Sequence, residues 1–229
     1  MKKVIILSLF VGFQLGLFAQ KGNTVNDLIH YFKEIRIPFN SDQINLTYKE
    51  LPYELALKYF FKGDTASSIY FKEVFNQEDY TLMSSAYVRK GIFPVFHYYF
   101  SGKLFMIYHL TSEKEDSETI LALMDDESTQ ADKLVIAYAT ISAPELYNWI
   151  RSKIYKDKVI VFEYRRIPLK NRDSTKNATE IIVNFYEIDF NKNKFIQIKT
   201  EKYMCIFELY QLNDASTEEV RNADPFYNY

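Results

Sequence analysis

The clearest pattern in the chain is a pair of apolar and aromatic runs separated by two turn-forming residues. Residues 94–100 and 103–109 are rich in aromatic and β-branched side chains, and Ser101-Gly102 stands between them. This arrangement predicts a β-hairpin, because glycine adopts positive φ at a two-residue turn without steric cost. Both faces of the hairpin are mostly apolar, so we expect it to lie inside a sheet that is covered on both sides.

The rest of the chain is also rich in residues that favour strands. Nineteen Tyr and nineteen Phe suit the half-buried surface of a sheet, whereas six glycines are few for a propeller or an up-and-down barrel with many tight turns. Further strands are predicted at 119–124, 134–141, 158–167, 180–190, 194–200 and 203–211. The stretch 69–88 has no pattern that decides between helix and strand.

Three segments have apolar positions at helical spacing. The first is 24–34, where Thr24 is suited to cap the helix. The second begins near Pro52 and ends at Gly63, which suits a left-handed stop. The third is 142–156, which opens with a capping box from Ser142 to Glu145. Its apolar face is Leu146, Trp149, Ile150 and Ile154.

These elements predict an α+β fold that is predominantly β. We expect an antiparallel sheet system of about eight to nine strands, either a sandwich or an open, barrel-like sheet, with two N-terminal helices and one inserted helix. Residues 20–212 are expected to form a single globular domain. The polar segment 213–229 is predicted to be a loosely held C-terminal tail. The other polar segments, 125–132, 168–179 and 191–193, are predicted to be loops or turns.

The first residues have the order of a secretory signal peptide. Two lysines precede the uncharged apolar run 4–18, and Ala19-Gln20 follows as a cleavage site. The alternative is a retained anchor, but the run is shorter than the roughly 20 apolar residues that a span needs. The segment resembles those of exported bacterial proteins. We therefore expect residues 1–19 to be removed and the protein to be periplasmic or extracellular, without stable membrane insertion.

The composition excludes several classes of protein. The chain has 28 basic and 30 acidic residues and is 48% hydrophobic, which is unlike a disordered protein. The formal net charge of −2 lacks the basic excess of a general nucleic-acid binder, so we expect no nucleic-acid partner. The single cysteine excludes an internal disulfide framework.

No catalytic constellation is visible in the sequence. If Ser101-Gly102 forms a two-residue turn, His97 and His109 point to opposite faces of the hairpin and cannot share a zinc ion. Cys205 lies in an apolar run and is predicted to be a buried, unreactive thiol. The acidic loop 125–132 lacks the spacing of a calcium loop. We expect no catalytic residue, no metal and no cofactor.

These observations favour an exported, non-catalytic binding protein that uses an aromatic-rich β surface to contact a protein or a glycan. The candidate binding residues are His97, Tyr98, Tyr99 and Tyr108. One alternative is an extracytoplasmic hydrolase of glycans or peptides with carboxylates as acid and base. A further alternative is an outer-membrane β-barrel, which the predicted helices disfavour.

Overall fold

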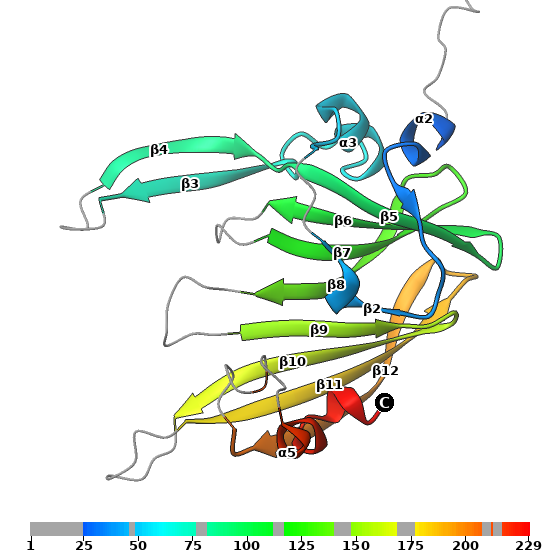
Figure 1. The fold of residues 1–229 in the computed structure, drawn as a ribbon. Coiled ribbons are helices and arrows are strands. Elements are labelled where there is room, and N and C mark those ends of the chain that lie inside the picture. The colour runs from blue at the N-terminus through cyan, green and yellow to red at the C-terminus, as the bar shows by residue number, and fades with distance from the viewer. Residues whose placement is uncertain are drawn as a thin grey trace, which may run out of the picture.

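The structure is a computed structural model that describes residues 25–45, 49–76, 82–111, 117–139, 148–168, 177–207, 212 and 217–229. Most of these residues lie in strands (Figure 1), which confirms a predominantly β fold with a large, mostly antiparallel sheet. The strands are β1 (Lys33–Glu34), β2 (Phe39–Asn40), β3 (Ile69–Phe75), β4 (Leu82–Arg89), β5 (Ile92–Phe100), β6 (Lys103–Thr111), β7 (Ser117–Met124), β8 (Gln130–Ala139), β9 (Asn148–Ile154), β10 (Lys158–Pro168), β11 (Asn177–Asp189) and β12 (Lys194–Cys205). The helices are α2 (Val25–Ile29), α3 (Tyr53–Tyr59) and α5 (Glu218–Ala223), with 3-10 turns η1 (Ser41–Gln43) and η2 (Pro225–Tyr227).

Ten of these strands form one continuous sheet. Its order is β1-β5-β6-β7-β8-β9-β10-β11-β12, with β2 beside β9, and every pairing is antiparallel except that of β1 with β5. The sheet curls, so that the end formed by β11 and β12 approaches strands from its first half. The Phe195 amide donates to the Asp132 carboxylate on β8 at 2.9 Å, and the rings of Phe100 and Phe190 lie 5.7 Å apart. The main sheet is therefore curved rather than flat.

The predicted central hairpin is confirmed as β5–β6. His97 pairs with Met106 and Tyr99 with Leu104, while Ser101 and Gly102 both have positive φ. Its two faces are covered by different clusters, as the apolar pattern predicts. The inner face of the curl carries Phe39, Val95, Tyr98, Phe105, Ile107, Leu121, Leu123, Ile136, Ile154, Val159, Val161 and Ile188. The outer face packs against the first helices through Leu28, Phe32, Leu51, Leu55, Ala56, Tyr59, Phe60, Ile92, Leu104, Met106, Tyr108, Leu110, Ile120, Ala122 and Met124.

Both N-terminal helices are present, although α2 is shorter than predicted. After Ile29 the backbone tightens, with the amide of Phe32 bonding the carbonyl of Ile29, and β1 then pairs with β5. The apolar face predicted for the second helix, Leu55, Ala56, Tyr59 and Phe60, is buried, and Gly63 has a φ of +78° beyond α3. Sheet pairing therefore ends the first helix, and glycine supports the turn after the second.

The predicted helix at 142–156 is wrong where the structure describes it, because residues 148–154 form strand β9. Alternation explains the strand: Trp149 and Arg151 face outward, whereas Ile150 and Ile154 face the inner cluster. Pairing with β8 and β10 satisfies the β9 backbone, so long-range contacts override the local helical spacing. The capping box lies outside the described residues.

The strand count also differs from the prediction, because the described residues contain twelve strands. Segments 194–200 and 203–211 were predicted as two strands, but their described part forms the single strand β12. The ambiguous stretch 69–88 forms a hairpin from β3 and β4. Two-residue strands β1 and β2 have no signal in the sequence.

The C-terminal segment is not loosely held where the structure describes it. Thr217 caps α5 by accepting from the Val220 amide, and Phe226 is buried against Phe162 of β10 with ring centroids 5.1 Å apart. This segment covers the outer face of β10 and β11, which Figure 1 shows behind α5. In the part of the chain described here, no helix combines the length and apolarity needed to cross a bilayer.

Candidate interaction surface

Two of the predicted binding residues are core residues. Tyr98 is 3% exposed and stacks on Phe105 with ring centroids 4.7 Å apart. Tyr108 lies in the outer-face cluster, and its hydroxyl donates to Gln130 at 2.6 Å. Burial raises the pKa of both phenols, so both stay neutral. Their positions serve packing on opposite faces of the sheet.

The other two predicted residues, His97 and Tyr99, lie on β5 and share one face of the β5–β6 hairpin. Tyr99 is 57% exposed, and His97 is buried with its ring 6.2 Å from that of Tyr99. His109 lies on the other face, where its Nδ1 is 2.9 Å from the Thr119 hydroxyl. The structure therefore does not bring the four candidate residues together on one surface, and Tyr99 alone among them is strongly exposed.

A different region carries a group of four exposed apolar side chains. Strands β3 and β4 form a two-stranded sheet that projects from the main sheet (Figure 1). Phe71, Leu82, Met83 and Tyr87 are 45%, 53%, 68% and 74% exposed. We call these four residues the hairpin surface. Soluble proteins rarely expose several large apolar side chains on one element, and such groups are a feature of interaction sites.

The root of the hairpin is firmly held against α3. The guanidinium of Arg89 lies 4.1 Å from the ring centroid of Tyr53, and the hydroxyls of Tyr53 and Ser68 are 2.8 Å apart. The Lys90 amide also donates to the carbonyl of buried Ser68 at 2.8 Å. These contacts fix the two ends of the hairpin, so the hairpin surface extends from a rigid base.

The rings on the hairpin surface are not coplanar. Phe71 and Tyr87 are cross-strand partners, with centroids 5.3 Å apart and planes inclined by 61°. This edge-to-face pair presents an uneven apolar surface with the exposed aliphatic side chains of Leu82 and Met83 farther along β4. In the described chain, the outer edges of β3 and β4 also pair with no strand.

Sequence reasoning missed this surface because the segment 69–88 showed no single period. One signal was present: the seven residues from Leu82 to Val88 contain no charge. An uncharged strand-forming run suits either a covered central strand or an edge that pairs with another chain. The exposure of β4 excludes a covered central strand among the described residues.

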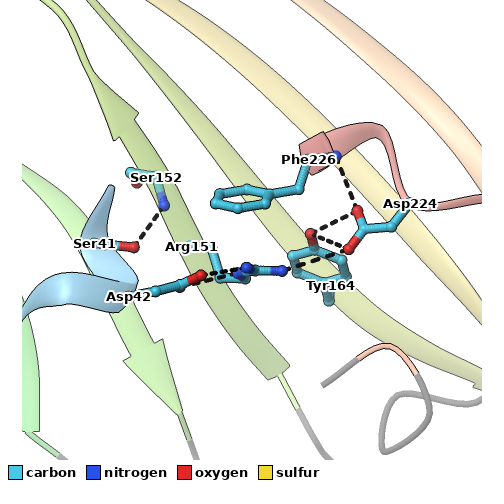
Figure 2. A network of polar contacts seen from close by, with 7 residues as sticks. All are labelled: Ser41, Asp42, Arg151, Ser152, Tyr164, Asp224 and Phe226. Carbon is cyan, nitrogen blue, oxygen red and sulfur yellow. Dashed lines mark hydrogen bonds and ion pairs between the residues drawn. The ribbon is translucent and has the colours of Figure 1, made fainter. Parts of the chain in front are cut away.

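A second cluster, shown in Figure 2, is a polar network around the buried side chain of Arg151. The Nε of Arg151 donates to Asp42 at 3.0 Å, and its Nη1 lies 3.5 Å from Asp224. The Tyr164 hydroxyl donates to Asp224 at 2.8 Å, and the Phe226 amide donates to it at 2.9 Å. The network thus joins η1, β9, β10 and the turn that begins η2.

The chemistry of this network is structural. Burial raises the pKa of the Asp224 carboxyl, while hydrogen bonds from Phe226 and Tyr164 and the charge of Arg151 act in the opposite direction. The Arg151 guanidinium also lies 3.5 Å from the Phe226 ring centroid. The polar groups of the network bond one another, so the network attaches η1 and the C-terminal segment to the sheet.

Two hollows flank Lys62 beside α3, with volumes of about 610 and 660 Å³. The first is lined by three acids, Glu54, Asp125 and Glu127, and the hydrolase alternative requires carboxylates in such a hollow. The Asp125 carboxylate, however, accepts from both the amide and the hydroxyl of Thr129 at 2.8 and 2.7 Å. Among the described residues no group of three metal-ligating side chains occurs.

No known family model matches the chain, and neither the curated proteins nor the solved structures include a match. The candidate site therefore depends on the geometry of this molecule alone.

Proposed function

We propose that the protein is an exported, non-catalytic binding protein that contacts a protein partner through the hairpin surface. The observation that carries this proposal is the exposure of Phe71, Leu82, Met83 and Tyr87 on a hairpin anchored at its base. A two-stranded sheet without cover is marginally stable in water. A partner that covers these side chains would remove apolar surface from water and stabilise the hairpin.

The proposed partner is a protein that adds an extended segment to the hairpin. Both outer edges have backbone amides and carbonyls that no strand in the described chain uses. Strand addition satisfies such groups and lets the side chains of Leu82 and Tyr87 fix the register. A glycan fits less well, because stacking on sugars favours flat ring faces and the rings of Phe71 and Tyr87 are inclined.

Export is the second part of the proposal. It is supported by the basic start, the apolar run 4–18 and Ala19-Gln20, which have the order of a signal peptide. An extracytoplasmic site would present the hairpin surface to other exported proteins.

The proposal is tested by site-specific photocrosslinking in the source cells. A photoreactive benzoylphenylalanine replaces Tyr87 in one variant and Tyr227 in a matched variant, since both side chains are exposed. We expect irradiation to yield protein adducts at position 87, and far fewer when Phe71→Ser and Leu82→Ser are added. The proposal is wrong if position 87 yields no protein adduct, or if positions 87 and 227 yield the same adducts.

A further inference from the structure

The sequence of β4 reads almost the same in either direction when residues are grouped by size and polarity. Around Ser85 lie Ser84 on one side and Ala86 on the other, and all three are small. Met83 and Tyr87 follow at equal distance from Ser85, and Leu82 and Val88 lie beyond them. The strand is thus a palindrome of large and small uncharged residues.

This palindrome lies on a free edge. Strand β4 pairs with β3 along one edge, and in the described chain no strand pairs with its other edge. Every residue from Leu82 to Tyr87 is exposed. Two antiparallel strands related by a two-fold axis present the same residues to each other in reverse order, so a palindrome is complementary to itself.

The free edge of the main sheet differs from that of β4 in charge. Strand β12 ends the main sheet, and it carries Lys194, Lys199, Glu201 and Lys202 beside the exposed Ile196, Ile198 and Met204. Lysines on an edge strand oppose pairing between identical chains, because like charges would meet. Strand β4 carries no charged residue between Leu82 and Val88.

We propose that the partner on the hairpin surface is a second copy of this chain, whose β4 pairs antiparallel with β4 about a two-fold axis at Ser85. This inference rests on the proposed function and names its partner. The pairing sets Met83 opposite Tyr87 of the second copy, and Leu82 opposite Val88 of the second copy. The small residues at the centre let the two backbones approach, and the sulfur–aromatic contacts lie symmetrically on either side.

Such a pairing converts two isolated hairpins into one four-stranded sheet. It satisfies backbone groups on both β4 edges and covers Met83, which is the extra residue where the β3–β4 register shifts. Sheets of three or more strands with an apolar face are stable where a lone hairpin is marginal. Each hairpin projects from its main sheet and is anchored at Tyr53 and Arg89, so the β4 strands of two copies can meet at the projecting hairpins.

The test is the mass of the purified protein in solution, measured by sedimentation equilibrium over a range of concentrations. We expect a dimer for the unaltered protein. Ser85→Lys places two like charges at the axis and should weaken the dimer at least about tenfold, since like-charge juxtaposition costs several kcal/mol. Thr200→Lys, at a solvent-exposed position on the edge strand β12, should leave the dimer unchanged.

Two oppositely charged variants test whether a monomeric Ser85→Lys protein has only lost its fold. Ser85→Glu alone should also be monomeric, whereas a mixture of Ser85→Lys and Ser85→Glu proteins should recover the dimer as a heterodimer. An unaltered protein that stays monomeric, a Ser85→Lys protein that stays dimeric, or a mixture that does not recover the dimer overturns the inference. A monomer that still forms adducts with another protein at position 87 refutes the second copy but leaves the proposed function standing, while absence of any adduct refutes both.

Discussion

The β3–β4 hairpin and strands β9–β12 carry the same kinds of side chain, but these side chains have different roles in the two regions. On β10, aromatic residues are covered: Phe162 packs under Phe226, and the buried hydroxyl of Tyr164 is bonded to Asp224. On the hairpin, Phe71 and Tyr87 pair with each other and are otherwise open to water. The C-terminal segment covers one region, and nothing in the described chain covers the other.

This contrast shows that aromatic content does not by itself identify a binding surface. What distinguishes the two regions is a covering segment held by a buried charge network. Arg151 links η1 through Asp42 and the start of η2 through Asp224 to the sheet, and so keeps Phe226 in place. The hairpin has an anchored root but no such cover within the described chain.

The strongest test of the contrast removes the network. Arg151→Met leaves Asp224 buried without its cationic partner, and breaking a buried ion pair in this way costs about 3–5 kcal/mol of the free energy of unfolding. We expect this loss in urea denaturation, together with faster hydrogen exchange in α5 and η2. Arg165→Met is the control, because Arg165 is half exposed and its pair with Glu163 contributes at most about 1 kcal/mol. Equal effects of the two substitutions would show that the network does not hold the cover.

A second test removes positive charge from the edge strand β12. Replacing Lys199 and Lys202 of β12 by threonine removes two charges while keeping strand-forming side chains. We expect new self-association, seen as an increase in mass by light scattering that β4 substitutions do not abolish. Lys192→Thr, in the turn before β12, is the matched control and should leave the mass unchanged. An unchanged mass in the double variant would show that Lys199 and Lys202 do not prevent self-association through β12.

A third test uses pH to loosen the C-terminus. The pKa of Glu201 is lowered to about 2, by hydrogen bonds from Lys199, Tyr203 and Tyr229 in that order. A carboxyl with a lowered pKa stabilises the fold above its ordinary value of 4.5, and that contribution is lost as pH falls toward 2. We expect the protection of residues 227–229 against hydrogen exchange, taken relative to the intrinsic exchange rate at each pH, to fall over this range. In Glu201→Gln this protection should be low at all these pH values, and a pH-dependent protection that persists there would exclude Glu201 as the cause.

The smallest expected effect is on the hairpin itself. Tyr87→Ser in a monomeric Ser85→Lys background should change the free energy of unfolding by no more than about 0.5 kcal/mol, because an exposed side chain contributes little to folding. Phe162→Ala, in the covered region, should cost about 3–5 kcal/mol in the same measurement. A large loss from Tyr87→Ser would mean that the residue serves the fold rather than a partner.

Parts of the fold could be predicted because their pattern is local. The β5–β6 hairpin follows from two apolar runs around Ser101-Gly102, and the buried face of α3 follows from helical spacing before Gly63. The candidate binding residues were harder to predict. Tyr98 and Tyr99 are neighbours in sequence, yet one is buried in the core and the other is exposed.

The sequence by itself determined a β-rich molecule, its central hairpin and the uncharged character of Leu82–Val88, because alternation and turn chemistry act between near neighbours. Only the tertiary structure decided that residues 148–154 form a strand, that Arg151 meets Asp42 and Asp224, and that β4 has a free edge. These features depend on which distant segments pair, and the gain from such pairing outweighs local preference.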